Sequence, residues 1–563
     1  MKKLVAVILT AVMAVGLLAG CGSQGGTSAE TEAKQAVETT KGVVEEVVVE
    51  ATSGIAEVEV DIEQEELDKL IAEHTTDDGR TFVTFAIADD PGTMFPQGSG
   101  NIQARNVVME GVFEGLFQYQ GTGGEMKPVL AESYEMIDNG EGWTFRVKLK
   151  DYVYDSEGNH FTANDVKFVL DDMVKEYNAY YGKKITGVTV IDEFTAEIAF
   201  NSYKANDYST AITTYLYTQA AYEASPDKMI TTPVGTGPYK LTEWTSGSTL
   251  TVEKRDDYWE SDESKIVRNS YSNVDIINFK VIKDSAQQLI ALEKGEIDAC
   301  AQLPVIELDR FAESGDYNIF TNLADTVVTL GFNPDPSNSA CSDINVRKAV
   351  CLGFDAQGVV DAVEYGKGEV TCCTFIDIFQ DYDSKWESEE YFPYDVAAAK
   401  QALADAGYAD GITLRLLYEN SEKLNNVAQI LQSYLSEIGI TLELLPTESS
   451  LYTTYSRDFT QFDVTLATSG SSTFGSFGSI NRMDDTFCQF VEGLSDMTYN
   501  ASKYAYSDWS YCSELHYEIK DNYYMYGIYA PLNYNVTTKI IKGFVLTQKG
   551  SLSPNCCEYI WND

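Results

Sequence analysis

Apolar positions recur with two different spacings along the chain, and segments of the two kinds alternate. Trp143–Lys150 alternates apolar and polar residues and predicts a strand with one wet face, while the mostly apolar run Thr81–Ala88 predicts a buried strand. Asp395–Ala406 and Asn425–Ile438 have helical spacing, and a glycine follows each. The other predicted elements are strands at Val188–Ala199, Leu250–Lys254 and Thr441–Leu445, a helix from Thr162, and a helix over Ser285–Lys294. Helices and strands in this order predict α/β lobes with mixed, partly parallel sheets.

The first 20 residues have the pattern of an export signal. Lys2 and Lys3 precede an apolar run, Leu4–Leu18, which is too short for a comfortable membrane span. Small residues then lead to Cys21, and this ending resembles the signal of bacterial lipoproteins, in which the cysteine is acylated. The resemblance implies a mature chain that starts at Cys21 and is held by lipid on the outer face of the cell membrane. The alternative is an ordinary secretory signal with a chance cysteine.

An acidic segment follows the signal. Residues 22–79 contain no aromatic residue and no proline, and their acids far outnumber three lysines. This composition predicts a disordered tether over residues 21–79, in which Glu63–His74 has the spacing of a short helix. The globular part is predicted to begin near Thr81.

The whole chain is strongly acidic. Its 563 residues include 40 Lys and Arg against 87 Asp and Glu, a formal net charge of −47. This balance excludes a nucleic-acid binder, because phosphates are neutralised by basic residues. We expect the excess charge to be spread out and to serve solubility. The three histidines lie far apart, which argues against a His-based metal centre or a catalytic triad, so we expect no metal and no cofactor.

Ten cysteines occur in the chain. The vicinal pairs at 372–373 and 556–557 do not have zinc-site spacing. Disulfides remain open for an exported protein, but we favour reduced, buried thiols for the nine cysteines other than Cys21.

Several motifs, taken together and in order, resemble the extracytoplasmic solute-binding proteins of ABC importers, in the family of oligopeptide, dipeptide and nickel receptors. They span about residues 80–450. The motifs are Gly111–Tyr119, Lys127–Tyr134, Gly142–Phe145, Phe161–Val166, Thr232–Lys240, Asp257–Trp259, Leu292–Asp298, Gly331–Asn333, Asn345–Val350 and the helix from Tyr394 to Tyr408. Gly235–Tyr239 lacks the spacing of a phosphate loop, and we interpret it as a tight turn that enters a strand.

The resemblance implies a two-lobed, clam-like α/β fold of the periplasmic-binding-protein kind, with an extra subdomain in the first lobe. Mapped onto this chain, the first lobe is discontinuous and comprises residues 81–115, 233–325 and 527–563. The extra subdomain is residues 116–232, and the second lobe is residues 326–526. A ligand would bind between the lobes and close them by a hinge motion.

The resemblance also places candidate ligand-binding residues. Peptide receptors of this family pair the ligand amine with an Asp in a Trp-containing segment, but Phe462–Phe474 lacks Trp and offers a Ser/Gly-rich loop, residues 468–482. Hydroxyls, aromatic rings and an arginine of this kind suit neutral or carboxylate-bearing solutes. The candidates are Asp89, Phe95, Asn333, Tyr418, Ser469, Phe474 and Arg482. For the loop, a surface segment without ligand contact is the alternative.

The resemblance implies a receptor that is not an enzyme and that delivers a peptide or similar solute to a permease and an ATPase. An oligosaccharide or another organic solute remains an alternative ligand. A secreted hydrolase with a carboxylate pair is a third reading, although no G-x-S-x-G or H-E-x-x-H motif occurs. We expect a monomer that contacts the membrane only through its lipid.

Overall fold

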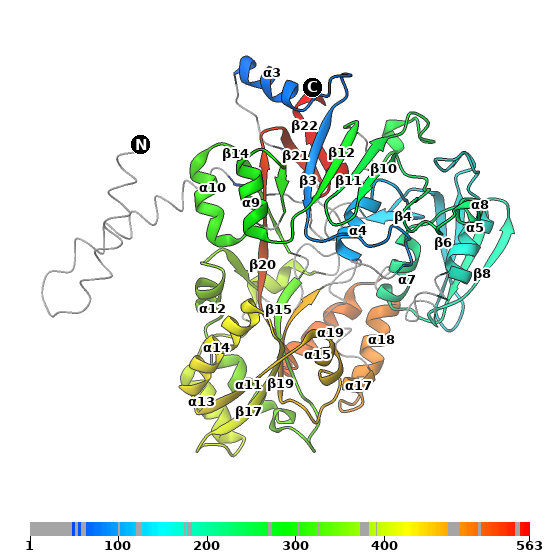
Figure 1. The fold of residues 1–563 in the computed structure, drawn as a ribbon. Coiled ribbons are helices and arrows are strands. Elements are labelled where there is room, and N and C mark those ends of the chain that lie inside the picture. Colours follow the sequence, from blue (N-terminus) through cyan, green and yellow to red (C-terminus); the bar gives the residue numbers. More distant parts are fainter. Residues whose placement is uncertain are drawn as a thin grey trace, which may run out of the picture.

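The computed structural model forms two lobes with a smaller subdomain beside the first (Figure 1). A long strand, β20 (Met525–Thr538), runs through both lobes. The structure describes residues 48–50, 55–57, 63–98, 102–119, 126–173, 176, 183–267, 273–301, 303–324, 326–371, 382–389, 391–470, 485–504, 508–545 and 552–562.

The first lobe is built on a mixed sheet. Its strand order is β10-β11-β12-β3-β13-β20, and β14 pairs with the other edge of β20. The strands are β3 (Phe82–Ile87), β10 (Tyr239–Thr245), β11 (Thr249–Lys254), β12 (Ile276–Val281), β13 (Ala299–Cys300) and β14 (Tyr317–Leu323). Strand β3, which the run Thr81–Ala88 predicted as a buried strand, is parallel to β12 and β13.

Each face of this sheet has its own core. Helices α9 (Ser285–Glu293) and α10 (Leu308–Ser314) cover one face, where Ile319 and Val536 pack. Helix α4 (Ile102–Met109) and the small sheet of β2 (Ile55–Glu57), β21 (Ile541–Val545) and β22 (Cys557–Tyr559) lie on the other. On that side Phe320 meets Phe544 edge-on, with ring centroids 4.8 Å apart.

The subdomain contains a four-stranded antiparallel sheet in the order β6-β7-β9-β8. Its elements are β4 (Phe117–Tyr119), β5 (Met126–Pro128), β6 (Ala131–Asp138), β7 (Trp143–Leu149), β8 (Ile185–Asp192), β9 (Thr195–Phe200), α5 (Ala163–Lys167), α7 (Ala205–Thr213) and α8 (Gln219–Ala224). The single strand predicted at Val188–Ala199 is wrong. The Asp192 carboxylate accepts the Phe194 N–H (3.0 Å), and this turn divides the segment into β8 and β9.

The second lobe has the strand order β15-β19-β17-β18. Its strands are β15 (Thr326–Phe332), β16 (Gly368–Val370), β17 (Ile412–Glu419), β18 (Ile440–Thr447) and β19 (Val464–Gly470). Its helices are α11 (Ile344–Leu352), α12 (Ala356–Val363), α13 (Val396–Asp405), α14 (Glu422–Ser436), α15 (Ser449–Tyr455), α17 (Asp485–Cys488), α18 (Leu494–Tyr504) and α19 (Ser510–Asp521). Gly407 and Gly439, which follow α13 and α14, have φ values of 88° and 92°, so both are in the left-handed region that glycine favours.

The turn at Gly235 requires glycine because two backbone segments approach closely there. The N–H of Gly237 donates to Val112 O (3.0 Å) and the N–H of Tyr239 to Gly111 O (2.9 Å). A Cβ on Gly235 would lie 2.0 Å from Val112 O. The turn therefore joins the entry of β10 to the segment after α4, a structural role rather than a phosphate site.

The segment before residue 81 corrects one prediction. Residues 63–79, expected in the disordered tether, contain α3 (Gln64–Glu73), whose Leu67, Leu70 and Ile71 pack on the first-lobe core. Upstream, β1 (Val48–Glu50) pairs in parallel with β14. The short helix expected at Glu63–His74 is confirmed, but the ordered body starts before Thr81.

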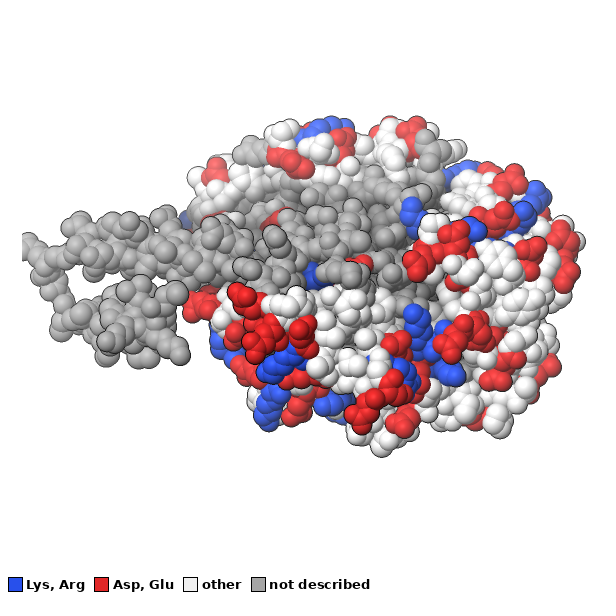
Figure 2. Space-filling model, turned by 90° about the horizontal axis from the view of Figure 1, so that it is seen from above, with Lys and Arg blue, Asp and Glu red and all other residues white. Residues whose placement is uncertain are grey.

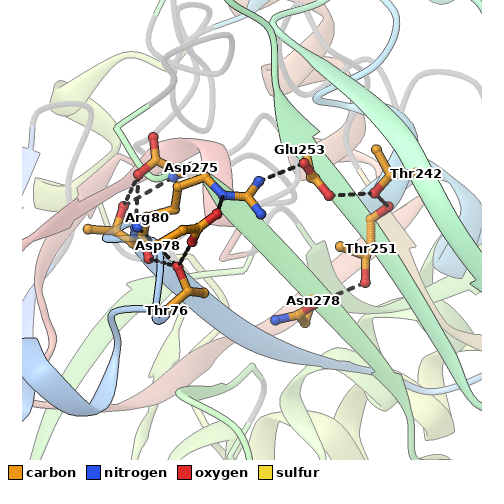
Figure 3. Close-up of polar contacts among 9 residues, drawn as sticks. Thr76, Asp78, Arg80, Thr242, Thr251, Glu253, Asp275 and Asn278 are labelled. Atoms are coloured by element: carbon orange, nitrogen blue, oxygen red, sulfur yellow. Dashed lines mark hydrogen bonds and ion pairs between the residues drawn. The ribbon is translucent and has the colours of Figure 1, made fainter.

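Polar contacts fix this segment to the first lobe (Figure 3). The Arg80 guanidinium donates to Glu253 of β11 (2.7 Å) and to Asp78 (3.0 Å). The N–H of Thr81 donates to Asp275 (2.8 Å) at the start of β12. Such long-range pairs cannot be inferred from a local composition that looks like a spacer.

His74 provides a pH-dependent part of this attachment. Its Nε2 lies 2.8 Å from Asp298 Oδ1 and its Nδ1 lies 2.8 Å from Leu70 O. Both partners are acceptors, so only the doubly protonated imidazolium satisfies both contacts. Burial by itself lowers the pKa of His74, but the hydrogen bond and charge of Asp298 outweigh it, and the pKa is raised above 6.5.

We therefore expect His74→Gln to destabilise the protein by about 1–2 kcal/mol at pH 5.5 and by less at pH 9. A group whose pKa is raised on folding stabilises the fold fully below its unfolded pKa, and this contribution is lost as the pH rises through the folded pKa. Urea unfolding of wild type and variant at both pH values measures the difference. A penalty that is equal or larger at pH 9 would contradict a charged His74.

Candidate functional site

The two lobes are joined by neighbouring strands. Strand β14 of the first lobe leads almost directly into β15 of the second, and both pair antiparallel with β20. Strand β16 adds to β20 at Tyr529–Pro531, where β20 passes between the lobes. Val327 and Ala530 are buried there, and Leu323 packs against them. We call this region the crossing, and it is the place where a hinge between the lobes would act.

On the second-lobe side, two hydroxyl groups meet next to the crossing. Ser469 of β19 lies opposite Val327, and its Oγ is 2.6 Å from Thr329 Oγ1 of β15. Both side chains are buried, and they share a sheet face with Ala467 and Gly331. The structure thus places one predicted residue, Ser469, beside the lobe junction.

On the first-lobe side, carboxylates follow the end of β3. Asp89 lies 3.0 Å from Lys283, which follows the parallel neighbour β12. Asp90 accepts hydrogen bonds from Trp244 Nε1 (3.2 Å) and from the N–H groups of Gly92 and Gly247, and these donors hold its pKa below 3.8 against the effect of burial. The carboxyl ends of adjacent parallel strands form the edge where α/β sheets usually bind ligands.

Asn333 is a correction to the predicted site. Strand β15 starts at the crossing and runs away from it, because Thr326 pairs with Gly470 whereas Phe332 pairs with Val464. Asn333 therefore lies about 20 Å from Val327 along the strand, at the far edge of the lobe. Its side chain is fully buried and donates to Phe459 O and Phe462 O (both 2.7 Å). Its geometry is that of a structural cross-link.

Two predicted aromatic residues pack into cores. Phe95 is 6 % exposed and packs against Tyr217 and Tyr222, with ring centroids 6.1 and 5.7 Å from its own. Tyr418 is 2 % exposed, lies in the second-lobe core, and pairs with Leu466 of β19. In this arrangement both rings serve packing. Phe474, Arg482 and Cys21 lie outside the described residues.

Sequence reasoning missed Thr329 and Lys283. Thr329 lies in an apolar run that only predicts a strand, and its partner Ser469 is 140 residues away. Lys283 follows a strand, as Asp89 does, so its position in the sequence could have identified it as a candidate residue.

A cavity of about 780 Å³ lies at the base of the subdomain, away from the crossing. Its lining includes Lys148, Lys150 and Lys265, which pair with Glu132 (2.6 Å), Glu260 (3.3 Å) and Asp262 (3.5 Å). All residues that line this cavity belong to the first lobe and its subdomain, so a solute there would not contact the second lobe. We therefore favour the lobe junction as the ligand site.

No set of three or more His, Cys, Asp or Glu side chains that could hold a metal ion occurs among the described residues. Within the same residues, no helix has the length and apolar character needed to cross a membrane. The seven described cysteines are buried, and burial raises the pKa of Cys300 to about 11. Seen from the first-lobe end, acidic and basic side chains are intermixed over the surface (Figure 2).

Comparison with known proteins gives a family match over most of the body. The model of the family described as bacterial extracellular solute-binding proteins, family 5, matches residues 125–487. The match runs from the subdomain through the crossing and most of the second lobe.

Individual proteins are similar at low identity. Di/tripeptide-binding protein 1 of Pseudomonas aeruginosa is 24 % identical over 380 residues, which are 62 % of this chain and 68 % of that protein. The structure of HbpA2 from Haemophilus parasuis superposes with a TM-score of 0.72 at 18 % identity, covering 85 % of this chain and 100 % of that one. NikA from Brucella suis in complex with Fe(III)-EDTA gives a TM-score of 0.69 at 20 % identity, covering 85 % and 99 %. Both superpositions include the two lobes.

Proposed function

Because this chain belongs to the bacterial extracellular solute-binding proteins, family 5, we propose that it captures a peptide or a similar organic solute between its lobes and delivers it to an ABC importer. The family and the two-lobed α/β fold predicted from the sequence are confirmed. The observation that carries the proposal is the family match across residues 125–487, which spans both sides of the crossing.

A peptide is the solute class that we favour. The relative from Pseudomonas aeruginosa is named for di- and tripeptides. At the lobe junction of this chain, the Thr329–Ser469 hydroxyl pair provides hydrogen-bond donors and acceptors. The Asp89–Lys283 ion pair provides one charged group of each sign. A zwitterionic peptide, with an ammonium, a carboxylate and amide groups, matches such a set.

The partners and the anchor are part of the same proposal. A solute receptor of this family works outside the cytoplasmic membrane, and its loaded form docks on a permease that an ATPase drives. Cys21, at the end of the export signal, would carry the lipid that holds the receptor on the membrane surface. We propose that the chain acts as a monomer and catalyses no reaction.

Thermal unfolding of the chain from residue 22 onward tests the solute class. A ligand at 100 times its Kd stabilises the folded state by about 2.7 kcal/mol. We expect a mixture of di- and tripeptides to raise the Tm, with oligosaccharides and metal chelates as parallel arms. A rise with oligosaccharides or chelates but not with peptides would overturn the peptide assignment. Mass spectrometry of the recovered ligand should show it intact, since a cleaved ligand would support a hydrolase instead.

A further inference from the structure

Four side chains, two from the subdomain and two from the second lobe, meet away from the crossing. Asp138 ends β6 and Tyr203 follows β9, both in the subdomain, while Tyr499 and Lys503 lie on α18 of the second lobe. Lys503 Nζ is 3.0 Å from Asp138 Oδ2 and 4.3 Å from the centre of the Tyr203 ring. The Tyr203 and Tyr499 rings meet edge-on, with centroids 5.5 Å apart. We call these four residues the clasp.

The subdomain half of the clasp is fixed without the second lobe. The Tyr203 hydroxyl donates to Asp138 Oδ1 (2.6 Å), and Trp143 of β7 packs edge-on against the Tyr203 ring at 5.4 Å. Tyr203 is only 5 % exposed. The Tyr203 hydroxyl, the Gly140 N–H and Lys503 hold the pKa of Asp138 at about 2, so its carboxylate is charged at any physiological pH. The subdomain therefore presents a ready anion beside an aromatic ring.

The second-lobe half supplies the matching cation. Lys503 inserts between Tyr203 and its own helix neighbour Tyr499, at 4.3 and 5.9 Å from the ring centres, and its side chain is 19 % exposed. An ammonium group over aromatic faces and next to a carboxylate combines two favourable contacts. The contacts of Lys503 with Asp138 and Tyr203 link the second lobe to the subdomain and would be lost if the lobes separated.

The clasp lies on a different side of the molecule from the crossing. Figure 1 shows α18 beneath α7 of the subdomain, whereas β15 and β20 pass between the lobes nearer the centre and α12 lies beyond them. A rotation about the crossing moves groups far from it more than groups beside it. A hinge rotation about the crossing would therefore displace the two halves of the clasp more than groups beside the crossing.

A second ion pair between the lobes serves as a comparison. Lys367 precedes β16, and its Nζ lies 3.1 Å from Asp309 of α10 in the first lobe. Because β16 pairs with β20 at the crossing, this ion pair lies near the hinge and changes little on opening. It is also a Lys–Asp ion pair between the two lobes, but it lies close to the crossing, so the opening motion would displace it little.

We propose that the clasp holds the lobes closed and thereby sets how tightly a solute is retained, an inference that rests on the proposed function for its ligand part. The extra subdomain then acts in closure, because it carries the anionic half of the contact. Contacts present only in the closed state shift the population toward that state and lower the apparent Kd.

Small-angle X-ray scattering without ligand tests the mechanical part, with Lys503→Met, Asp138→Asn and Lys503→Arg beside the wild type. We expect the first two variants, which remove the pair from opposite lobes, to show a larger radius of gyration. Lys503→Arg keeps the cation and should restore the wild-type curve. The control Lys367→Met removes the ion pair at the crossing and should leave the curve unchanged. Identical curves for all variants, or an equal effect of the control, would overturn the clasp.

Titration calorimetry with the solute found in the thermal screen tests the ligand part. Lys503→Met and Asp138→Asn should each raise the Kd about three- to tenfold. The double variant should bind no more weakly than either single variant, because both substitutions remove the same ion pair. An unchanged Kd in both variants would overturn the proposed role. A screen that finds no solute would refute only the proposed function, since the scattering result stands without one.

Discussion

Arg255→Met should lower the free energy of unfolding by about 3–5 kcal/mol, the largest effect that we expect for a single substitution in the first lobe. The Arg255 side chain is 1 % exposed. Its guanidinium donates to Gly237 O and Asp155 O (both 3.0 Å), with longer contacts to Gly235 O and Thr236 O. Methionine fills the space but leaves the buried Gly237 O without a donor. It also removes one of two donors from Asp155 O, Gly235 O and Thr236 O, which keep the Gly158 N–H, the Ser156 N–H and Trp259 Nε1. Urea denaturation followed by tryptophan fluorescence measures the loss.

The matched control for Arg255 is Arg146→Met. Arg146 is 46 % exposed and pairs with Glu197 (2.7 Å) and Glu135 (3.0 Å) on the subdomain surface. Ion pairs of this kind contribute about 0–1 kcal/mol, so the control should be nearly neutral. If both arginines cost the same, the Gly235 turn is not organised by Arg255.

Asn333→Leu should cost about 2–4 kcal/mol of stability, the largest loss that we expect in the second lobe. The substitution removes two donors to Phe459 O and Phe462 O, and it removes the oxygen that accepts the Asp335 N–H (2.9 Å). Phe459 O and the Asp335 N–H then lack a partner at the end of β15, while Phe462 O keeps the donor Arg415 Nη2 (3.2 Å). Thermal and urea unfolding measure the effect, and Asn426→Leu, at an exposed position of α14, is the control.

This variant also separates a structural role of Asn333 from the ligand role that its sequence position indicated. A cross-link predicts a lower unfolding free energy and an unchanged solute Kd for the folded protein. A ligand residue would show the reverse, namely a weaker Kd with intact stability. A weaker Kd with intact stability would show that Asn333 takes part in binding despite its distance from the crossing.

Local pattern predicted many of the elements. The alternation in Trp143–Lys150 became β7, and the glycines after Ala406 and Ile438 end α13 and α14 as expected. These signals work because strand and helix periods reflect which face of each element is buried. The motif order then pointed to the family and so to the two-lobed arrangement.

The rest depended on contacts between distant residues. The direction of β15 decides that Asn333 lies far from the junction, and only its pairing with β19 reveals that direction. Residues 63–79 had the composition of a spacer, yet His74 within them and Arg80 next to them bind Asp298 and Glu253, more than 170 residues away. Aromatic residues near strand ends, such as Phe95 and Tyr418, suit a core as well as a ligand site, and composition does not distinguish the two.

Strand β20 has a consequence for the order in which the protein assembles. Residues 525–529 complete the second-lobe sheet beside β15, and residues 532–538 complete the first-lobe sheet beside β14. Neither sheet is complete until residues 525–538 are in place, because β20 follows every other strand of both sheets in the sequence. Folding of both lobes therefore depends on this one segment, and contacts over such sequence separations form slowly.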